Sequence, residues 1–156
     1  MSKILTRINA HELSLTNLDK LYWPDEGISK GQMLEYYRTL APYLLPHLIN
    51  RPFTLVRYPN GIRDDFFYQK ECPEHAPDWV KRIPVSVDGG QKQINFVLCN
   101  DLPTLIWLAN LGCIEVHAWA AKADKLENPD FAVFDLDPAP PANFSDSLQV
   151  GLLIRS

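Results

Sequence analysis

The fold class follows from the helical pattern Ser29-Lys-Gly-Gln-Met-Leu-Glu-Tyr-Tyr-Arg-Thr-Leu-Ala-Pro-Tyr-Leu-Leu45 and from the strand pattern Phe53-Thr-Leu-Val-Arg-Tyr58 that comes after it. Apolar residues recur at helical spacing along the first run, and Ser29 and Gln32 have the spacing of a capping box. Pro42 should kink this helix or divide it in two. The second run is rich in residues that favour strands, and Pro59-Asn-Gly61 closes it with a turn signal. The two patterns together predict a helix that leads into a strand.

Segments on both sides of this pair add more strands and helices. Further strands are expected at 66–70, 83–87, 93–99, 114–119 and 131–135, with Asp88-Gly-Gly90 joining two of them as a hairpin. Helices are expected from Asp101 to Leu111 and, capped by Ser145, near the end of the chain. We therefore predict one α+β domain over residues 1–156, with a mixed, mostly antiparallel sheet and packed helices. Residues 1–12 are expected to form a loose arm, and the domain is expected to be truncated because the sequence stops inside an apolar run.

Composition places the chain among ordinary globular proteins. Hydrophobic residues make up 46% and charged residues 22% of the sequence, which is enough apolar material for a core. Neither a secretory signal nor an apolar run of about 20 residues is evident, so we expect a cytoplasmic protein. Cys72, Cys99 and Cys113 are odd in number and widely spaced. They match neither a disulfide framework nor a zinc pattern, and we expect buried, reduced thiols.

Charge is distributed unevenly along the sequence. The net charge of −4 argues against a nucleic-acid partner. However, residues 1–92 hold 12 Lys and Arg against 11 Asp and Glu, whereas residues 93–156 hold 3 against 8. A phosphate-binding surface beside a cluster of metal-binding carboxylates would have this distribution, and so would a chance arrangement.

The segment Phe131-Ala-Val-Phe-Asp135-Leu-Asp137-Pro carries the clearest chemical signal. In a strand, Asp135 and Asp137 face the same side with their Cα atoms about 6–7 Å apart. Two carboxylates this close repel each other unless a proton or a cation lies between them. Oxygen ligands of this kind suit Mg²⁺ or Mn²⁺, and a two-metal site would support phosphate chemistry. A strand-end turn is the alternative interpretation of the same residues.

Many short motifs together resemble one family across roughly residues 13–155. They include Leu15-Thr-Asn-Leu-Asp-Lys20, Trp23-Pro-Asp-Glu-Gly-Ile-Ser-Lys30, Arg57-Tyr-Pro-Asn-Gly61, Phe67-Tyr-Gln-Lys70, Trp107-Leu-Ala-Asn-Leu-Gly112, Glu115-Val-His-Ala-Trp119 and Phe134-Asp-Leu-Asp-Pro138. In this order they resemble the N-terminal half of the polymerase domain of bacterial and archaeal DNA ligase D, in the archaeo-eukaryotic primase superfamily. That resemblance implies template-dependent addition of NTP or dNTP to DNA 3′ ends in non-homologous end joining, with Mn²⁺ or Mg²⁺. It also implies recognition of DNA ends that carry a recessed 5′-phosphate.

The resemblance assigns two groups of charged or polar residues. Asp135 and Asp137 match the first two of three catalytic, metal-binding aspartates of the family. Asn17, Lys20 and Lys30 match its 5′-phosphate pocket, and two ammonium groups with an amide can fix a terminal phosphate. Solvated lysines are the alternative interpretation for Lys20 and Lys30.

Further residues match the family's contacts to template and nucleotide. Phe67 and Tyr68 resemble an aromatic pair that stacks on a template base, which contributes about 1–3 kcal/mol per base. Strand alternation favours one ring in the core, and we expect that ring to be Phe67. Arg57 and Lys70 are expected near template or nucleotide phosphates, although ordinary surface charges would look the same. The match places His117 beside the nucleotide, against the alternative of a core histidine.

Two family motifs have no counterpart in this sequence: the Ser-x-His segment that holds the triphosphate, and the third aspartate. Polymerisation by this chain alone is therefore expected to be slow or absent. Four interpretations stay open. A second polypeptide could supply the missing half, or the chain could be a fragment of a longer enzyme with ligase or nuclease modules. It could also be a non-catalytic module that binds 5′-phosphorylated ends, or a protein-interaction remnant. The apolar residues Leu152, Leu153 and Ile154 favour self-association or a partner subunit.

Overall fold

The structure is a computed structural model and describes residues 3–155. Its elements, in chain order, are β1 (Lys3–Ile8), β2 (His11–Thr16), β3 (Leu21–Trp23), β4 (Ile28–Ser29), α1 (Lys30–Leu48), β5 (Pro52–Arg57), β6 (Phe67–Gln69), β7 (Arg82–Val87), the 3-10 turn η1 (Asp88–Gly90), β8 (Lys92–Leu98), α2 (Leu102–Asn110), β9 (Cys113–Ala118) and α3 (Phe144–Arg155). The predicted α+β class is confirmed. Among the described residues, no helix is long and apolar enough to cross a membrane.

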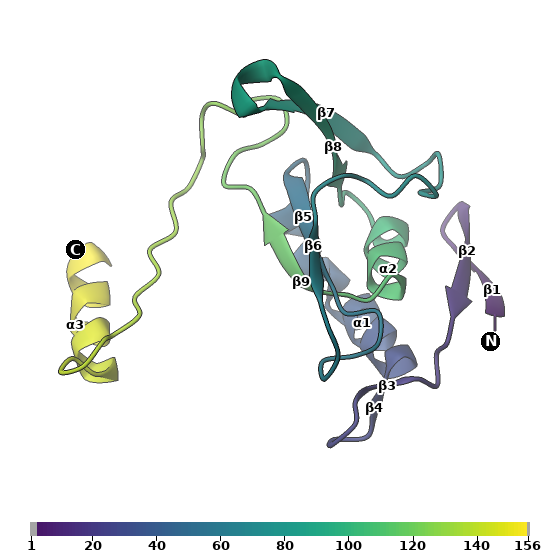
Figure 1. Cartoon of the computed structure of the whole chain (residues 1–156), viewed down its shortest axis with the longest axis horizontal. Helices are drawn as coiled ribbons and strands as arrows, with labels where there is room; N and C mark the ends of the chain where they lie inside the picture. Colours follow the sequence, from purple (N-terminus) through teal and green to yellow (C-terminus); the bar gives the residue numbers. More distant parts are fainter. Residues whose placement is uncertain (1–2, 156) are drawn as a thin grey trace.

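Strand β5 organises the main sheet, in which every pairing is antiparallel (Figure 1). One edge of β5 pairs with β6 at its C-terminal end and with β8 at its N-terminal end, and its other edge pairs with β9. The predicted hairpin is present as β7 and β8, which form six residue pairs around η1. Helices α1 and α2 cover one face of this sheet, so the opposite face is left with little cover.

The core lies between the sheet and the two helices. Phe53 and Leu55 of β5 are 1% exposed and belong to the same buried cluster as Met33 of α1 and Leu105 of α2. Fully burying side chains of this size stabilises a fold by about 1.5–3 kcal/mol each. All three cysteines are buried and free, as predicted.

Helix α1 begins where the sequence predicts and continues further than expected. Ser29 caps it, with Gln32 completing the capping box in both directions. The helix runs unbroken through Pro42 and Pro46, so the prediction that Pro42 could divide it is wrong. Both prolines lie on the exposed side of α1, where water can bond the carbonyls that they leave without a partner.

The N-terminal segment is not a loose arm over its described residues. Strands β1 and β2 pair along six residues to form a hairpin. The side chain of Asn110, at the end of α2, accepts from Thr16 N at 3.0 Å and donates to Ser14 O at 3.1 Å. Leu13 is buried in the core. The hairpin is therefore fixed to the domain by contacts far apart in sequence, which the local pattern did not reveal.

The expected strand at 131–135 is absent, and this expectation was wrong. Residues 131–137 are extended but belong to no sheet. Figure 1 shows this segment leaving the body and leading to α3, which stands apart. A lone strand cannot pair its own backbone groups, so it needs a neighbouring edge. Helix α3 begins at Phe144, two residues earlier than a cap at Ser145 would place it, and its cap is instead Asn143, whose side chain accepts from Ser145 N at 2.8 Å.

Candidate nucleic-acid site

Lys30 is a buried cation at the first residue of α1. Its side chain is largely enclosed, with the residue 3% exposed, and its Nζ donates to Thr16 O at 2.7 Å. Burial, followed by the nearby charges of Lys20 and Arg57, lowers the pKa of Lys30 to about 8. The N-terminus of α1 adds partial positive charge at the same place.

Lys20 and Arg57 are held close to Lys30 by different parts of the chain. Lys20 follows β2 in a turn closed by its own N–H and Asn17 O at 3.1 Å, and its ammonium donates to Pro59 O at 3.0 Å. Arg57 ends β5, where its Nε donates to Leu111 O at 3.1 Å. Burial lowers the pKa of Arg57 from its ordinary value.

The backbone of Gly112 lies close to that of Tyr58, and this contact positions the carbonyl of Leu111 that binds Arg57. Gly112 follows α2 with a φ of +83°, and a Cβ there would lie 2.8 Å from Tyr58 O. Only glycine adopts this conformation and fits this gap without strain. The turn after α2 therefore lies directly against the end of β5, where Leu111 O reaches the guanidinium of Arg57.

The three cations form a cluster without a counter-charge. No salt bridge to Lys20, Lys30 or Arg57 occurs within residues 3–155. Asn17 lies next to this cluster in the chain, directly after Thr16, in the left-handed conformation with a φ of 56°. Like charges held together without an acid create a positive field that favours an anion, and phosphate oxygens suit such donors. The structure thus brings together Asn17, Lys20, Lys30 and Arg57.

Phe67 and Tyr68, which are neighbours in β6, point to opposite faces of the sheet, and neither is in the core. Phe67 is 44% exposed and Tyr68 is 62% exposed, so the prediction of a core Phe67 is wrong. Strand β6 is a three-residue strand at the edge of the sheet, and its burial pattern shows two exposed residues followed by a half-buried one. The ring of Phe67 lies 5.2 Å from Arg57 Cζ, beside the cation cluster. Tyr68 packs edge-on to Phe66 and to His117, with centroids 6.0 and 6.1 Å apart.

His117 lies on the open face of the sheet and belongs to a small polar group. Its Nε2 is 3.1 Å from Glu115 Oε2, and Tyr58 donates a hydrogen bond to the same carboxylate. The Tyr58 bond, and then the His117 bond, lower the pKa of Glu115. His117 is half exposed, so the alternative of a core histidine does not hold. Glu115 fixes the ring of His117 toward Tyr68.

Lys70 lies further along the same face. It lines a hollow of about 500 Å³ with Lys92, Phe96 and Trp119. Because Leu55 pairs with Gln69, Lys70 continues the row that contains Thr54 and His117. The open face therefore carries Tyr68, Glu115, His117 and Lys70 in two adjacent rows.

Asp135 and Asp137 are not assembled with these residues. Both are exposed in the extended segment, and no hydrogen bond or ion pair to either carboxylate occurs within residues 3–155. Among those residues there is also no group of three or more side chains that could hold a metal ion. The two carboxylates offer the oxygen ligands that Mg²⁺ and Mn²⁺ prefer, but they do so alone.

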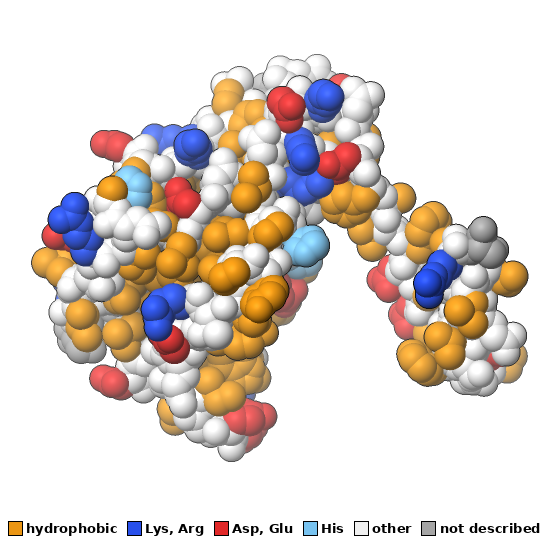
Figure 2. All heavy atoms as spheres, turned by 180° about the vertical axis from the view of Figure 1, so that it is seen from behind, with side chains coloured by type: hydrophobic (Ala, Val, Ile, Leu, Met, Phe, Trp, Pro, Cys, Tyr) orange, Lys and Arg blue, Asp and Glu red, His pale blue; other side chains and the backbone are white. Residues whose placement is uncertain are grey.

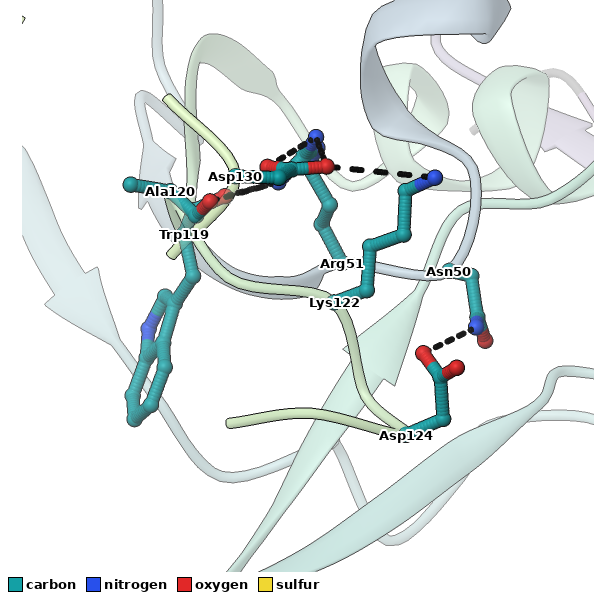
Figure 3. Close-up of polar contacts among 7 residues, drawn as sticks. All are labelled: Asn50, Arg51, Trp119, Ala120, Lys122, Asp124 and Asp130. Atoms are coloured by element: carbon teal, nitrogen blue, oxygen red, sulfur yellow. Dashed lines mark hydrogen bonds and ion pairs between the residues drawn. The ribbon is translucent and has the colours of Figure 1, made fainter. Parts of the chain in front are cut away.

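A buried arginine anchors the start of the segment that bears these aspartates (Figure 3). Arg51 is 8% exposed and donates from Nη1 to Trp119 O at 3.2 Å and to Ala120 O at 2.9 Å. Its Nη2 pairs with Asp130 at 2.7 Å, and Arg51 Cζ lies 4.6 Å from the centre of the Phe131 ring. The chain is thereby fixed at residues 130–131, beside the end of β9.

Sequence reasoning missed the roles of Tyr58 and Arg51. Glu115 and His117 could have been linked, because residues two apart in a strand share a face. Arg51 and Asp130 each stand directly before an apolar run, and opposite charges at two strand starts would have been the signal for their pairing. Nothing in the sequence indicated that Tyr58, directly after β5, would reach Glu115 on the neighbouring strand β9.

Fold and site together define an α+β domain with a cluster of cations at a helix N-terminus and exposed aromatic residues on an edge strand of its sheet. A family model, LigD primase-polymerase domain, matches residues 29–156. The chain therefore belongs to the LigD primase-polymerase domain family, as its motifs predicted. It is 36% identical over 138 residues to the bifunctional non-homologous end joining protein LigD of Bacillus subtilis (strain 168), covering 88% of this chain and 21% of that protein.

Two further relatives support the same family assignment. The multifunctional non-homologous end joining protein LigD of Mycolicibacterium smegmatis is 29% identical over 144 residues, which cover 91% of this chain and 19% of that protein. The solved polymerase domain from Mycobacterium tuberculosis ligase D, in complex with DNA, matches with a TM-score of 0.67 and 30% identity. That match covers 70% of this chain and 38% of the solved chain. This chain thus spans about a fifth of the length of the two named full-length relatives.

Proposed function

We propose that this chain binds DNA ends with a recessed 5′-phosphate and serves nucleotidyl transfer to DNA 3′ ends in non-homologous end joining. The observation that carries this proposal is the cluster of Lys20, Lys30 and Arg57, which has no acidic partner among the described residues. A buried ammonium held beside two other cations destabilises the fold unless an anion joins it. A terminal phosphate carries more negative charge than an internal one and would satisfy all three.

The open face would receive the template strand and the nucleotide. Tyr68 presents an exposed ring on which a base can stack regardless of sequence, and His117 and Lys70 lie beside it. Phe67, with Arg57 behind its ring, lies nearer the cation cluster and would contact the template next to the phosphorylated end. A strand bound across this edge would meet one aromatic residue on each side of β6.

Asp135 and Asp137 would hold Mg²⁺ or Mn²⁺ for the transfer step. When bound, such a cation neutralises charge on the reacting phosphate. The contribution of the chain itself is to hold the DNA end through the cation cluster and to orient His117 through Glu115. Asp135 and Asp137 must come near the open face of the sheet before they can take part in transfer together with His117.

End binding is tested with a gapped duplex that carries either a 5′-phosphate or a 5′-hydroxyl at the recessed end. Fluorescence anisotropy should show tighter binding to the phosphorylated duplex. Lys30→Met should remove that preference, whereas Lys81→Met, at an exposed lysine outside the cluster, should retain it. Equal affinity of the unaltered chain for the two duplexes would refute the assignment of the phosphate pocket.

Transfer is tested separately by primer extension on the phosphorylated gap with Mn²⁺. Extension that disappears in Asp135→Ala, with the 5′-phosphate preference intact, would support the full proposal. Preference without extension would favour the second candidate, a non-catalytic module for phosphorylated ends. One observation already favours that candidate: the cation cluster is assembled within the body of the domain, whereas the two aspartates stand away from it.

A further inference from the structure

Strand β1 is held in place and has a free edge. Within the described residues it pairs only with β2, so the backbone groups on its second edge have no partner strand. The hairpin is fixed through β2, because Asn110 binds the backbone at one end of that strand and the ring of His11 stacks on Trp79 at the other, with centroids 4.6 Å apart. β1 therefore offers a fixed edge to which another strand could add.

A hollow of about 580 Å³ lies between β1 and α1. Residues 6–9 all line it, and since neighbouring residues of a strand face opposite sides, the hollow follows the edge of β1 rather than one of its faces. Its other wall and its floor come from two helices, with Gly31, Leu34, Glu35, Arg38, Leu102 and Ile106. Leu34 and Ile106 belong to the main core, so the bottom of the hollow is apolar. Figure 2 shows apolar side chains, with Lys and Arg among them, at the end of the body opposite to α3, where Figure 1 places the hairpin.

The two faces of β1 offer different contacts to an added strand. Thr6 is opposite Leu13, which is buried, so the alternate residues Ile4, Thr6 and Ile8 share the face turned toward the core. Ile4 is nevertheless 51% exposed, which leaves apolar surface on this face of the edge strand. The outer face carries three exposed residues, Lys3, Leu5 and Arg7. An added strand would therefore meet apolar residues on one face and two cations around a leucine on the other.

The charges of β1 discriminate between possible partner strands. Neither Lys3 nor Arg7 forms a salt bridge within residues 3–155, even though Glu12 is opposite Arg7 in β2. A second copy of β1 that paired antiparallel around Leu5 would bring Lys3 of each chain opposite Arg7 of the other. Like charges directly opposite each other destabilise a strand pair, whereas opposite charges stabilise it. The edge therefore disfavours a second copy of itself and favours an acidic strand.

We propose that the free edge of β1 binds an acidic, extended segment of another protein, which adds as an antiparallel strand and seats alternate apolar side chains in the hollow beside α1. Main-chain hydrogen bonds to β1 would supply affinity, and the alternate side chains would supply specificity. Acidic side chains of the segment would lie opposite Lys3 and Arg7. The proposal is independent of the proposed function, because no residue of the cation cluster lines the hollow.

Synthetic peptides test the proposal on the whole chain. The probe is Val-Glu-Val-Ile-Val-Glu, flanked by Gly-Ser and labelled with fluorescein, whose glutamates lie opposite Arg7 and Lys3 when its first valine is opposite Ile8. Fluorescence anisotropy should show saturable binding of this peptide and weaker binding of a matched peptide with Lys in place of both Glu. Arg7→Glu should weaken binding of the acidic peptide roughly 2- to 30-fold and strengthen binding of the Lys peptide. Lys81→Glu, the same charge reversal at an exposed position outside the hollow, should change neither affinity.

Hydrogen exchange locates the bound peptide. The acidic peptide should slow exchange of the β1 amides that point away from β2, and a peptide with proline at its third and fourth positions, which lacks those two N–H donors, should not. Protection at the start of α1 in place of β1 would overturn the proposal, because the peptide would then bind only the cation cluster. Equal binding of the acidic and Lys peptides, or binding of neither, would also overturn it. Sedimentation that reveals a dimer of the unaltered chain, dissociated by the peptide, would assign the edge to a second copy instead.

Discussion

Replacing Lys30 by methionine should change how the stability of the fold depends on pH. Lys30 keeps an ammonium group in a place where it is 3% exposed and where Lys20 and Arg57 repel it. Its pKa falls from an ordinary value of 10.5 to about 8 in the folded chain. Each pKa unit corresponds to about 1.36 kcal/mol, so the folded state carries a penalty of about 3 kcal/mol for holding this charge.

The sign of the effect follows from proton binding in the two states. Below pH 8 the lysine is protonated both folded and unfolded, so the penalty is constant. Between pH 8 and 10.5 the unfolded state binds more protons, and the free energy of unfolding rises with pH. Between pH 7 and pH 9.5 this rise amounts to about 2 kcal/mol. Methionine fills a similar volume but cannot titrate, so the variant should lack this rise.

Urea unfolding at pH 7 and at pH 9.5 measures the difference between the unaltered chain and Lys30→Met. Other titrating groups affect both proteins equally. On going from pH 7 to pH 9.5, the unfolding free energy of the unaltered chain should therefore rise by about 2 kcal/mol more than that of Lys30→Met. At pH 7 the gain from removing the charge is reduced by the loss of the bond to Thr16 O, worth about 1–3 kcal/mol. Lys81→Met, at an exposed position, should follow the unaltered chain. Parallel profiles for Lys30→Met and the unaltered chain would refute the argument, because Lys30 would then be solvated like any surface lysine.

Three further outcomes are expected. Affinity for a 5′-phosphorylated end should fall as pH rises from 7 to 9 because Lys30 loses its proton near pH 8, and Lys30→Arg should resist that fall in anisotropy titrations; identical pH profiles would exclude Lys30 from the contact. Tyr68→Ala should change the unfolding free energy by no more than about 0.5 kcal/mol but weaken binding of a gapped template by about 1–3 kcal/mol, since the ring is 62% exposed; unchanged binding would remove Tyr68 from the template platform. Gly112→Ala should lose about 1–3 kcal/mol in urea unfolding, because its φ is +83° and its Cβ would meet Tyr58 O; a neutral result would contradict the close approach.

Local signals in the sequence predicted the elements that depend on neighbouring residues. The capping box at Ser29 places the start of α1, and Asp101 caps α2 by accepting from Thr104 N at 2.9 Å. The hairpin of β7 and β8 forms around Asp88-Gly-Gly90 as predicted. These features succeed because their hydrogen bonds join residues three or four apart or lie in adjacent strands.

Predictions that needed a distant partner were less successful. Residues 131–135 have the composition of a buried strand, yet a strand exists only when another edge pairs with it. Alternation correctly separated Phe67 from Tyr68, but it could not show that β6 is an uncovered edge with both rings exposed. The N-terminal hairpin depends on Asn110, which is 94 residues from Thr16.

The sequence by itself determined the family, the α+β class and the identity of the charged residues, because motifs and hydrophobic spacing are local properties of a chain. Only the tertiary structure decided that Lys30 is buried beside Lys20 and Arg57, and that Asp135 and Asp137 belong to a segment outside the sheet that carries His117. Solvation and electrostatic fields depend on distance in space, and residues 20, 30 and 57 come close only because the turn after β2, the start of α1 and the end of β5 meet at one end of the sheet.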